Sequence, residues 1–489
     1  MTRRTLDTDD LYFKARMSEF LSTLQALRSS AQMLGPALRG RFGNLLHANA
    51  RQRLRALSGG MLSVLLLFSV LLSPAQAVIE IEITQGGENA IPIAIVPFGW
   101  TGSGEAPEDI AGIVDADLQR SGNFAPLNRQ DLVANPVSGD VPRYANWRLS
   151  GADFLLIGGI KPSPSAASGY VVEFQLYDVL QQSLMTGFSF QVTDQTLRSA
   201  AHQISDEVYE EILGIPGAFN TQIAFVSVAG VVGDRTYQLQ LADADGENPQ
   251  AMLTSPRPIL SPAWAPDGVR IAYVSFENRT QSAIYVQDRE QGSRVKVISR
   301  AGINGAPSWS PDGERLAVTL SFEGNPDIYI LQIDSGQLRR VTDSDAIDTE
   351  PVWLDDENLV FTSDRSGGPQ LYQVSARGGR ANRLTFEGNY NTSATVSPDG
   401  STIAFVHGAG SGFQIGMIDR SSGLFQTLTQ GTLDESPSFS PNGQMIIYAT
   451  EKSGRGTLGA VSLDGSVVQS LSLDDGGSVR EPAWSPYSE

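Results

Sequence analysis

The second half of the chain alternates short apolar runs with turn residues in a unit that recurs six times. Each unit begins at an anchor position, usually a tryptophan within a Pro-x-Trp motif, and a turn of the Ser-Pro-Asp-Gly type follows. The anchors are Trp264, Trp309, Trp353, Val396, Phe439 and Trp484. Their spacing of about 43–45 residues, filled by short apolar runs, is typical of four-stranded β-propeller blades.

The phase of the repeat predicts how the propeller closes. Residues 223–226 form a second-strand pattern that no Pro-x-Trp motif precedes, whereas Glu481–Trp484 form an inner strand with nothing after it. The two chain ends therefore complete one blade, so residues 221–489 are predicted to form a six-bladed, all-β propeller. Closure of the ring removes the free sheet edges that favour aggregation.

Residues 90–214 show a mixed pattern. Runs of strand length occur at 93–96, 154–160, 170–177 and 185–192. Apolar residues at helical spacing predict one helix that begins near Pro107 and another that Asp194 caps. The region is therefore expected to be a small α/β domain. The motif Gly214-Ile215-Pro216-Gly217 indicates a hinge to the propeller, assigned to residues 215–220.

The N-terminus has the layout of an export signal. Residues 51–77 contain three arginines, an apolar run at 61–72 and a final Ala-Gln-Ala site, as in a secretory signal peptide. The run is shorter than the roughly 20 residues that span a bilayer, although a membrane anchor is the alternative. Residues 1–50 are an upstream extension: either translation starts later, for example at Met33, or the leucine-rich segment 11–34 forms a cytoplasmic helix.

The segment 78–89 that follows the signal alternates apolar and acidic residues. The alternating residues are Ile79, Glu80, Ile81, Glu82 and Ile83. A short strand of this kind near a terminus can add to the sheet edge of a partner. The alternative is an ordinary edge strand of the α/β domain.

Charge and composition narrow the range of partners. The formal net charge is −19. It becomes more negative if residues 1–77 are removed, because most of the charged residues in that segment are basic. Such a surface repels phosphate backbones, so nucleic acid is not an expected partner. The chain contains no cysteine. An exported protein without disulfides must be stable through its core, which a closed propeller of this length can provide.

Candidate catalytic chemistry is sparse. The three histidines are His47, His202 and His407, and no Gly-x-Ser-x-Gly motif or zinc-ligand spacing is present. His202 is interpreted as a residue at the boundary of its helix, and Asp243-Ala244-Asp245-Gly246 as a hairpin turn, since the glutamate of a calcium loop is missing. We therefore expect no catalytic residue, metal or cofactor. A propeller hydrolase or a lectin-like binder of periplasmic glycans is the alternative, because carboxylates can pair across a propeller opening.

The residues just before each Pro-x-Trp motif should surround one opening of the central channel, which we call the mouth. Its candidate binding residues are Thr349, Glu350, Glu435 and Glu481. Several carboxylates at one opening suit a partner loop that is basic or rich in hydrogen-bond donors. The alternative is that they are solvated loop charges.

Several motifs together resemble one known family. They include Pro97-Phe98-Gly99-Trp100, Ser261–Gly268, Thr349-Glu350-Pro351, Asp434-Glu435-Ser436-Pro437 and the ending Pro482–Tyr487. Over residues 78–489, and in this order, they are similar to the TolB family, the periplasmic component of the Tol-Pal system of Gram-negative bacteria. Residues 1–50 have no counterpart in that family.

The resemblance implies a monomeric, non-enzymatic periplasmic adaptor. The lipoprotein Pal would dock on the mouth, with Thr349 and Glu350 among its contacts, and would associate the protein peripherally with the outer membrane. TolA would bind the N-terminal segment Val78–Asn89. The implied roles are outer-membrane integrity and constriction during cell division, with other outer-membrane lipoproteins and colicins as further possible ligands.

Overall fold

The computed structural model describes residues 90–163, 169–231, 234–278, 281–410, 412–471 and 477–487. The upstream extension, the predicted signal peptide and the N-terminal strand at 78–89 therefore lie outside the described residues. Among the helices within these ranges, none combines the length and the hydropathy needed to cross a bilayer.

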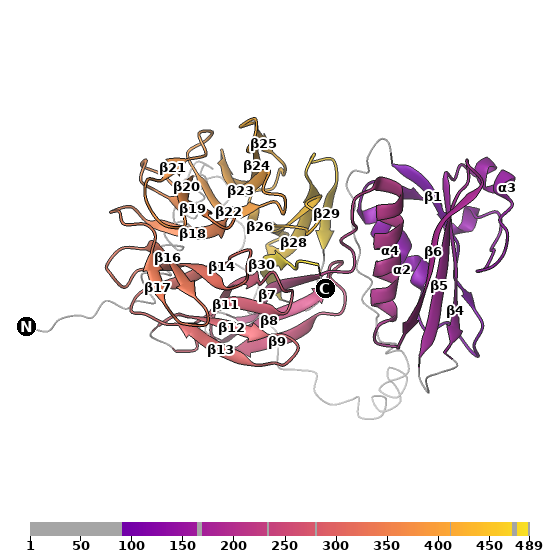
Figure 1. The fold of residues 1–489 in the computed structure, drawn as a ribbon, viewed down its shortest axis with the longest axis horizontal. Coiled ribbons are helices and arrows are strands. Elements are labelled where there is room, and N and C mark those ends of the chain that lie inside the picture. Colours follow the sequence, from indigo (N-terminus) through magenta and orange to yellow (C-terminus); the bar gives the residue numbers. More distant parts are fainter. Residues whose placement is uncertain are drawn as a thin grey trace, which may run out of the picture. The chain divides into compact units, whose positions relative to one another are not determined.

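The N-terminal α/β domain is built on one mixed sheet (Figure 1). Its strands are β1 (Ile91–Ile95), β2 (Gly99–Trp100), β3 (Phe124–Pro126), β4 (Phe154–Pro162), β5 (Tyr170–Asp178) and β6 (Ser183–Val192). They lie in the order β3-β1-β4-β5-β6, with β2 paired to β4. Strand β1 is parallel to β3 and β4, and the pairs β4–β5 and β5–β6 are antiparallel.

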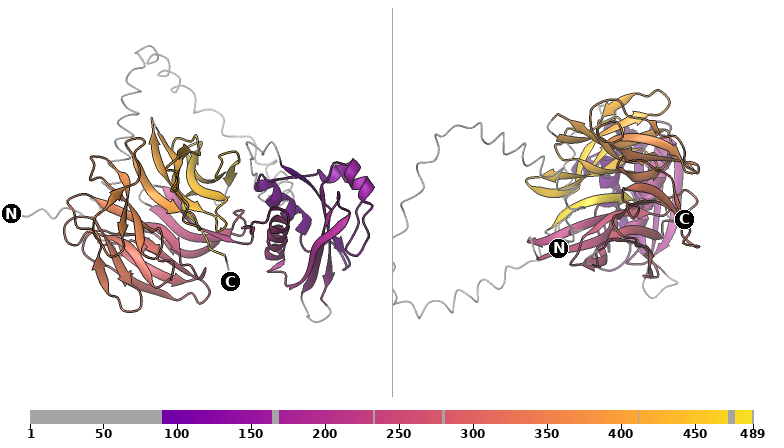
Figure 2. Two further views of the ribbon diagram at one scale, coloured as in Figure 1. Left: turned by 45° about the horizontal axis from the view of Figure 1, so that its top comes forward. Right: turned by 90° about the vertical axis from the view of Figure 1, so that its left-hand side faces the viewer.

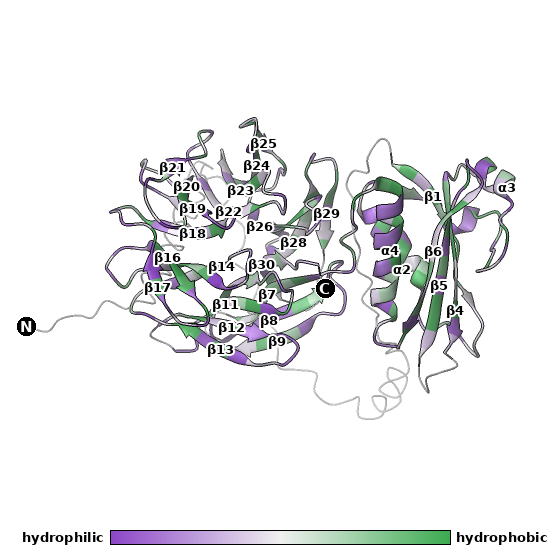
Figure 3. Cartoon of the chain, in the orientation of Figure 1, coloured by the Kyte–Doolittle hydropathy of each residue, from purple (hydrophilic) through white to green (hydrophobic). Residues whose placement is uncertain are grey.

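Two helices supply most of the helical part of this domain's core. The helices of the domain are α2 (Ile110–Arg120), α3 (Tyr144–Leu149), α4 (Leu197–Leu213) and the 3-10 turn η1 (Arg129–Asp131). Helices α2 and α4 contact each other, and the apolar stripes of both are buried against the strands (Figure 3). Residues such as Val114 and Leu118, or Ile204 and Val208, are four positions apart and therefore face the same side of their helix.

The helix starts show where local sequence was a good guide and where it was not. Asp109 caps α2, because its carboxylate accepts a hydrogen bond from the Gly112 N–H at 3.0 Å. The prediction that Asp194 caps α4 is wrong: Thr196 holds the cap position, and the Asp194 carboxylate accepts from the Tyr170 hydroxyl at 2.6 Å. Helix α4 ends at Gly214, whose left-handed φ of 70° suits glycine.

The remaining described strands form six four-stranded antiparallel sheets. Blade one contains β10 (Ile259–Trp264), β11 (Arg270–Ser275), β12 (Ala283–Asp288) and β13 (Arg294–Ile298); blade two, β14 (Asn304–Trp309), β15 (Arg315–Leu320), β16 (Asp327–Gln332) and β17 (Leu338–Arg340); blade three, β18 (Asp348–Trp353), β19 (Asn358–Ser363), β20 (Gln370–Ser375) and β21 (Asn382–Arg383). Blade four contains β22 (Asn391–Val396), β23 (Thr402–Ala409), β24 (Gly412–Asp419) and β25 (Phe425–Thr427); blade five, β26 (Glu435–Phe439), β27 (Met445–Lys452), β28 (Arg455–Ser462) and β29 (Val468–Leu471). The left-hand view of Figure 2 shows these sheets around a common centre.

The sixth blade joins the two ends of the propeller sequence. Its order is β30-β7-β8-β9, in which β30 (Ser478–Trp484) is followed by β7 (Gln222–Val231), β8 (Asp234–Asp243) and β9 (Gln250–Ser255). The seam is held by side chains as well, since the Trp484 indole donates to Thr221 Oγ1 at 2.8 Å. The predicted six blades and their closure by both ends are confirmed.

The anchor tryptophans explain the repeat physically. The Trp309 indole N–H donates to the Ala263 carbonyl of blade one at 3.1 Å, and the Trp353 indole donates to the Ser308 carbonyl of blade two at 3.1 Å. Trp264 makes the same bond, at 3.0 Å, to Ala483 of the closing blade. Each of these indoles therefore joins its blade to the preceding one.

We expect the substitution Trp309→Ala to reduce the free energy of unfolding by about 3–5 kcal/mol. The substitution removes a buried ring, its hydrogen bond to blade one, and the stacking of the Arg270 guanidinium 4.7 Å from the ring centroid. Denaturant titration of the purified variant measures the change. Phe386→Ala is the matched control, because that ring is exposed and its loss should change the free energy by less than about 0.5 kcal/mol.

Candidate functional site

Every inner strand of the propeller contains a bulge at the same place near the mouth. The ladder register shifts there, for example between Leu260 and Ala263 and between Gly305 and Ser308. One residue in each bulge has left-handed backbone geometry, with φ between 47° and 53°: these are Ser261, Ala306, Glu350, Ser393, Ser436 and Glu481. Each lies three positions before its anchor, so the mouth is surrounded by six equivalent left-handed residues.

The Pro-x-Trp motif accounts for the bulge. Proline follows the left-handed residue in five of the six blades. Proline has no N–H for a ladder, so a sheet accepts it at an edge strand or a bulge. The left-handed conformation costs a residue with a side chain about 1–2 kcal/mol. Local strain of this kind is concentrated at functional sites, which makes the mouth the first candidate for binding.

Glu350 connects blade three to blade four. Its carboxylate accepts hydrogen bonds from the Ser393 backbone N–H at 2.9 Å, the Ser393 hydroxyl at 3.0 Å and the Thr362 hydroxyl at 3.0 Å. Ser393 is the left-handed residue of the next blade, so the bond joins two equivalent bulges. A residue predicted from its charge as a partner contact therefore also holds two blades together.

Glu481 makes the corresponding connection between the closing blade and blade one. Its carboxylate accepts from the Ser261 backbone N–H, which joins the closing blade to blade one, and its side chain is largely buried. Thr349 lies beside Glu350, and its Oγ1 is 3.4 Å from Thr319 Oγ1 of blade two. Thr349, Glu350 and Glu481 thus each contact a neighbouring blade.

Glu435 differs from the other two predicted glutamates because its side chain is exposed. It lies in β26, one residue before the left-handed Ser436. The structure therefore distinguishes carboxylates that close the ring from one at the surface, a distinction that charge alone could not make. The other predicted contacts, Ile79, Glu80, Ile81, Glu82 and Ile83, lie outside the described residues.

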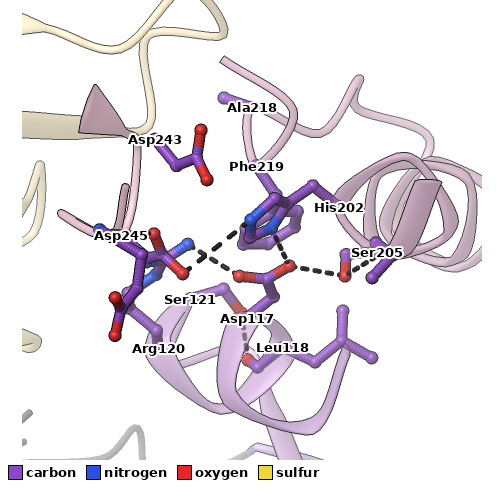
Figure 4. A network of polar contacts seen from close by, with 12 residues as sticks. Asp117, Leu118, Arg120, Ser121, His202, Ser205, Ala218, Phe219, Asp243 and Asp245 are labelled. Atoms are coloured by element: carbon purple, nitrogen blue, oxygen red, sulfur yellow. Dashed lines mark hydrogen bonds and ion pairs between the residues drawn. The ribbon is translucent and has the colours of Figure 1, made fainter. Parts of the chain in front are cut away.

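A second polar cluster lies where the α/β domain contacts the propeller (Figure 4). Three residues of this cluster are of the types that bind metal ions: Asp117, His202 and Asp245 have ligand atoms within 4.8 Å of one another. Arg120 and Arg198 already form ion pairs with the two carboxylates. Cations are therefore in place beside the ligand atoms, which disfavours a metal ion.

His202 is more deeply involved than its sequence position indicated. We interpreted it as a boundary residue of its helix, but its side chain is buried and its Nδ1 lies 2.7 Å from Asp117 Oδ2. The hairpin interpretation of residues 243–246 agrees with the backbone, because the Gly246 N–H donates to the Asp243 carbonyl at 2.8 Å. The contact of this turn with α4 depends on tertiary structure.

The architecture defines a class: a β-propeller protein with six blades, closed by both ends of its propeller sequence and preceded by a small α/β domain. Two family models match the chain, the TolB amino-terminal domain over residues 79–185 and the TolB beta propeller domain over residues 209–488. The chain belongs to the TolB family, as its motifs predicted.

Individual relatives agree with this assignment. The Tol-Pal system protein TolB of Thioalkalivibrio sulfidiphilus is 52% identical over 428 residues, which cover 87% of this chain and 98% of the relative. The protein of the same name from Xanthomonas oryzae pv. oryzae is 47% identical, with 86% and 97% coverage. The crystal structure of TolB from Acinetobacter baumannii has a TM-score of 0.76 and 41% identity, covering 84% of this chain and 100% of that one.

We expect Ala306→Gly to stabilise the propeller by about 0.5–1 kcal/mol, because glycine adopts the left-handed conformation without the clash of a Cβ atom. The midpoint of denaturant unfolding measures this change. Ala263→Gly is the matched control in an inner strand, at a position without positive φ, and should destabilise by a similar amount. Equal destabilisation by both substitutions would show that the bulge is unstrained.

Proposed function

We propose that this protein is a non-enzymatic adaptor of the Tol-Pal system, located in the periplasm, which binds the lipoprotein Pal at the mouth of its propeller. Membership of the TolB family over nearly the full length of its relatives carries the proposal. The relatives are named Tol-Pal system proteins, so a role in that system is the coarser conclusion. Pal as the partner and the mouth as its site are the finer steps.

The geometry of the mouth supports a binding role. Six equivalent bulges interrupt the inner ladders, and a bulge re-aims the side chains beside it. The bonds of Glu350 to Ser393 and of Glu481 to Ser261 join two pairs of these bulges before a partner arrives. A preformed site loses less conformational entropy on association, which favours affinity. The exposed Glu435 adds a negative charge that suits a donor-rich partner loop.

The two histidines in the described part of the chain support a role without catalysis. His202 lies against Asp117, and His407 is buried with its Nδ1 2.8 Å from Asn391 Oδ1. Burial lowers the pKa of His407 below its ordinary value. Both rings are therefore buried among structural contacts.

TolA is the second proposed partner, bound through residues 78–89. The alternation of Ile79, Ile81 and Ile83 with two glutamates favours addition to the edge of a partner's sheet. The segment directly precedes Ala90 and strand β1, so its removal deletes no described element. Two partners on separate parts of one chain would let it connect inner-membrane and outer-membrane components during constriction. Colicins and other lipoproteins are further candidates for the mouth.

We expect Glu435→Lys to weaken binding to Pal about tenfold, which corresponds to about 1.4 kcal/mol, because it reverses an exposed charge at the mouth. Titration calorimetry with the soluble domain of Pal measures the affinity. Glu314→Lys is the matched control, since it makes the same charge change in the turn at the other end of an inner strand. Glu350→Lys is a poorer test, because it also breaks the bonds between blades three and four.

Equal affinity of the Glu435 and Glu314 variants would contradict the assignment of the mouth. Retention of the protein on peptidoglycan sugars, or turnover of a glycan, with no affinity for Pal would instead favour the lectin-like or hydrolase alternative.

Deletion of residues 78–89 should abolish binding to TolA and leave thermal unfolding of the propeller unchanged. The comparison uses the chain from residue 78 and the chain from residue 90, each titrated with the soluble C-terminal domain of TolA. Reversed-alternation variants, in which the isoleucines and glutamates of the segment exchange places, are the control for composition. Undiminished TolA binding by the shortened chain would exclude this segment as the site.

A further inference from the structure

A buried ionic cluster joins the α/β domain to the closing blade of the propeller, and both domains belong to one compact unit. Asp117 of α2 is 1% exposed, His202 of α4 is 2% exposed, and Asp245 of the turn after β8 is 8% exposed. The His202 ring lies between the two carboxylates (Figure 4). Its Nδ1 is 2.7 Å from Asp117 Oδ2 and its Nε2 is 3.8 Å from Asp245 Oδ2.

The surrounding groups balance the charge of this cluster only when the histidine is protonated. Arg120 of α2 bonds to Asp117 Oδ1 at 2.8 Å, and Ser205 donates to Asp117 Oδ2 at 2.7 Å. Arg198 of α4 bonds to Asp243 at 3.1 Å and also pairs with Asp245. Three carboxylates thus face two arginines and one imidazole, and the partly buried Glu247 adds further negative potential from the turn.

The geometry of the ring leads to the same conclusion. A neutral imidazole that donates from Nδ1 to Asp117 would direct the lone pair of Nε2 toward the Asp245 carboxylate. Nε2 is buried and, within the described residues, has no hydrogen-bond partner. A proton on Nε2 replaces this repulsion with an attraction between residues of two different domains, because both ring nitrogens then carry hydrogens that point toward carboxylates.

A second titratable group holds the connection between the domains. The Asp206 carboxylate of α4 accepts from the backbone N–H groups of Phe219 and Asn220 at 2.7 and 3.1 Å. Gly217 passes so close that a Cβ atom there would lie 2.5 Å from the Asp206 Cα. Burial raises the pKa of Asp206 to about 7, even though its two backbone donors favour the ionised form.

We propose that the domain junction is a proton-controlled latch, in which protonated His202 joins Asp117 of the α/β domain to Asp245 of the propeller and its deprotonation loosens the contact. Asp206 acts in the same direction, because its protonated form is the one that its buried site favours. The latch is tightest on the acid side of neutrality.

The direction of the pH dependence follows from linkage. Burial lowers the pKa of His202, but the Asp117 and Asp245 carboxylates outweigh it and raise that pKa above the ordinary value of 6.5. Stabilisation by the proton is therefore complete below the ordinary pKa and is lost as the pH rises through the raised one. Burial in the junction favours the protonated form of Asp206, whose pKa is raised to about 7. The stabilisation that this proton contributes is therefore lost as the pH rises through about 7.

The absence of cysteine allows a clean test. Cysteines introduced at Leu149 and Phe386, which are 88% and 73% exposed, can carry a donor and an acceptor dye on the two domains of the full mature chain. Single-molecule energy transfer is then recorded between about pH 5.5 and pH 8.5. We expect the ratio of loosened to joined molecules to rise as the pH increases across this range. The total rise should be about tenfold for each unit by which the pKa of His202 in the joined form exceeds its pKa in the loosened form.

His202→Gln should make the loosened population large and reduce its pH dependence to the part that Asp206 contributes. Asp245→Asn, a change in a turn that leaves the helices intact, should do the same and guards against misfolding of the first variant. His407→Gln is the matched control, since it removes a buried histidine inside blade four and should keep the wild-type pH response.

Two results would overturn the proposal. The first is a wild-type distribution that does not change with pH, or a His202→Gln variant that responds as the wild type does. The second is a change produced at constant pH by added Zn²⁺ or by a chelator, which would show that the three ligand atoms hold a metal ion.

Discussion

The anchor tryptophans Trp264, Trp309 and Trp353 each donate an indole hydrogen bond to the blade before, so the closing blade and blades one to three are joined in series. Trp264 bonds to Ala483, near the end of the chain, and Trp309 bonds to Ala263. The pairing of β30 with β7 closes the ring, so neither end of the propeller sequence is left as an unpaired strand. The chain has no disulfide to hold its ends, so the seam between β30 and β7 must do so through ladder and side-chain bonds. The mouth and the domain junction both depend on that closure.

At the mouth, where we propose that a partner binds, the candidate contact residues also hold neighbouring blades together. The Glu350 and Glu481 carboxylates accept N–H groups from the left-handed residue of the next blade. A partner that contacts these glutamates would therefore also contact the bonds that set the spacing between blades. The exposed Glu435 carries charge without a burial of this kind. The affinity of the proposed partner and the rigidity of the ring would therefore depend on the same side chains.

The junction between the domains relies on buried charge, and its placement on the closing blade ties it to the ring. Buried ion pairs are poor sources of stability, because desolvation offsets much of their attraction. They do respond to protonation, since a lost proton leaves buried carboxylates without a balancing cation. Asp117, His202 and Asp245 come from three elements and two domains, so the complete cluster forms only when the two domains are in contact.

The sequence by itself determined the number of blades, the closing blade and two helices of the α/β domain, α2 and α4, because apolar periodicity and the repeated motif can be read directly along the chain. It did not predict the short helix α3. It also supplied the motifs of the family. Tertiary structure decided the roles of Glu350 and His202 and the cap of α4. Glu350 bonds to a residue 43 positions away, and His202 to one 85 positions away. No local pattern encodes such partners, because folding alone brings them within hydrogen-bond distance.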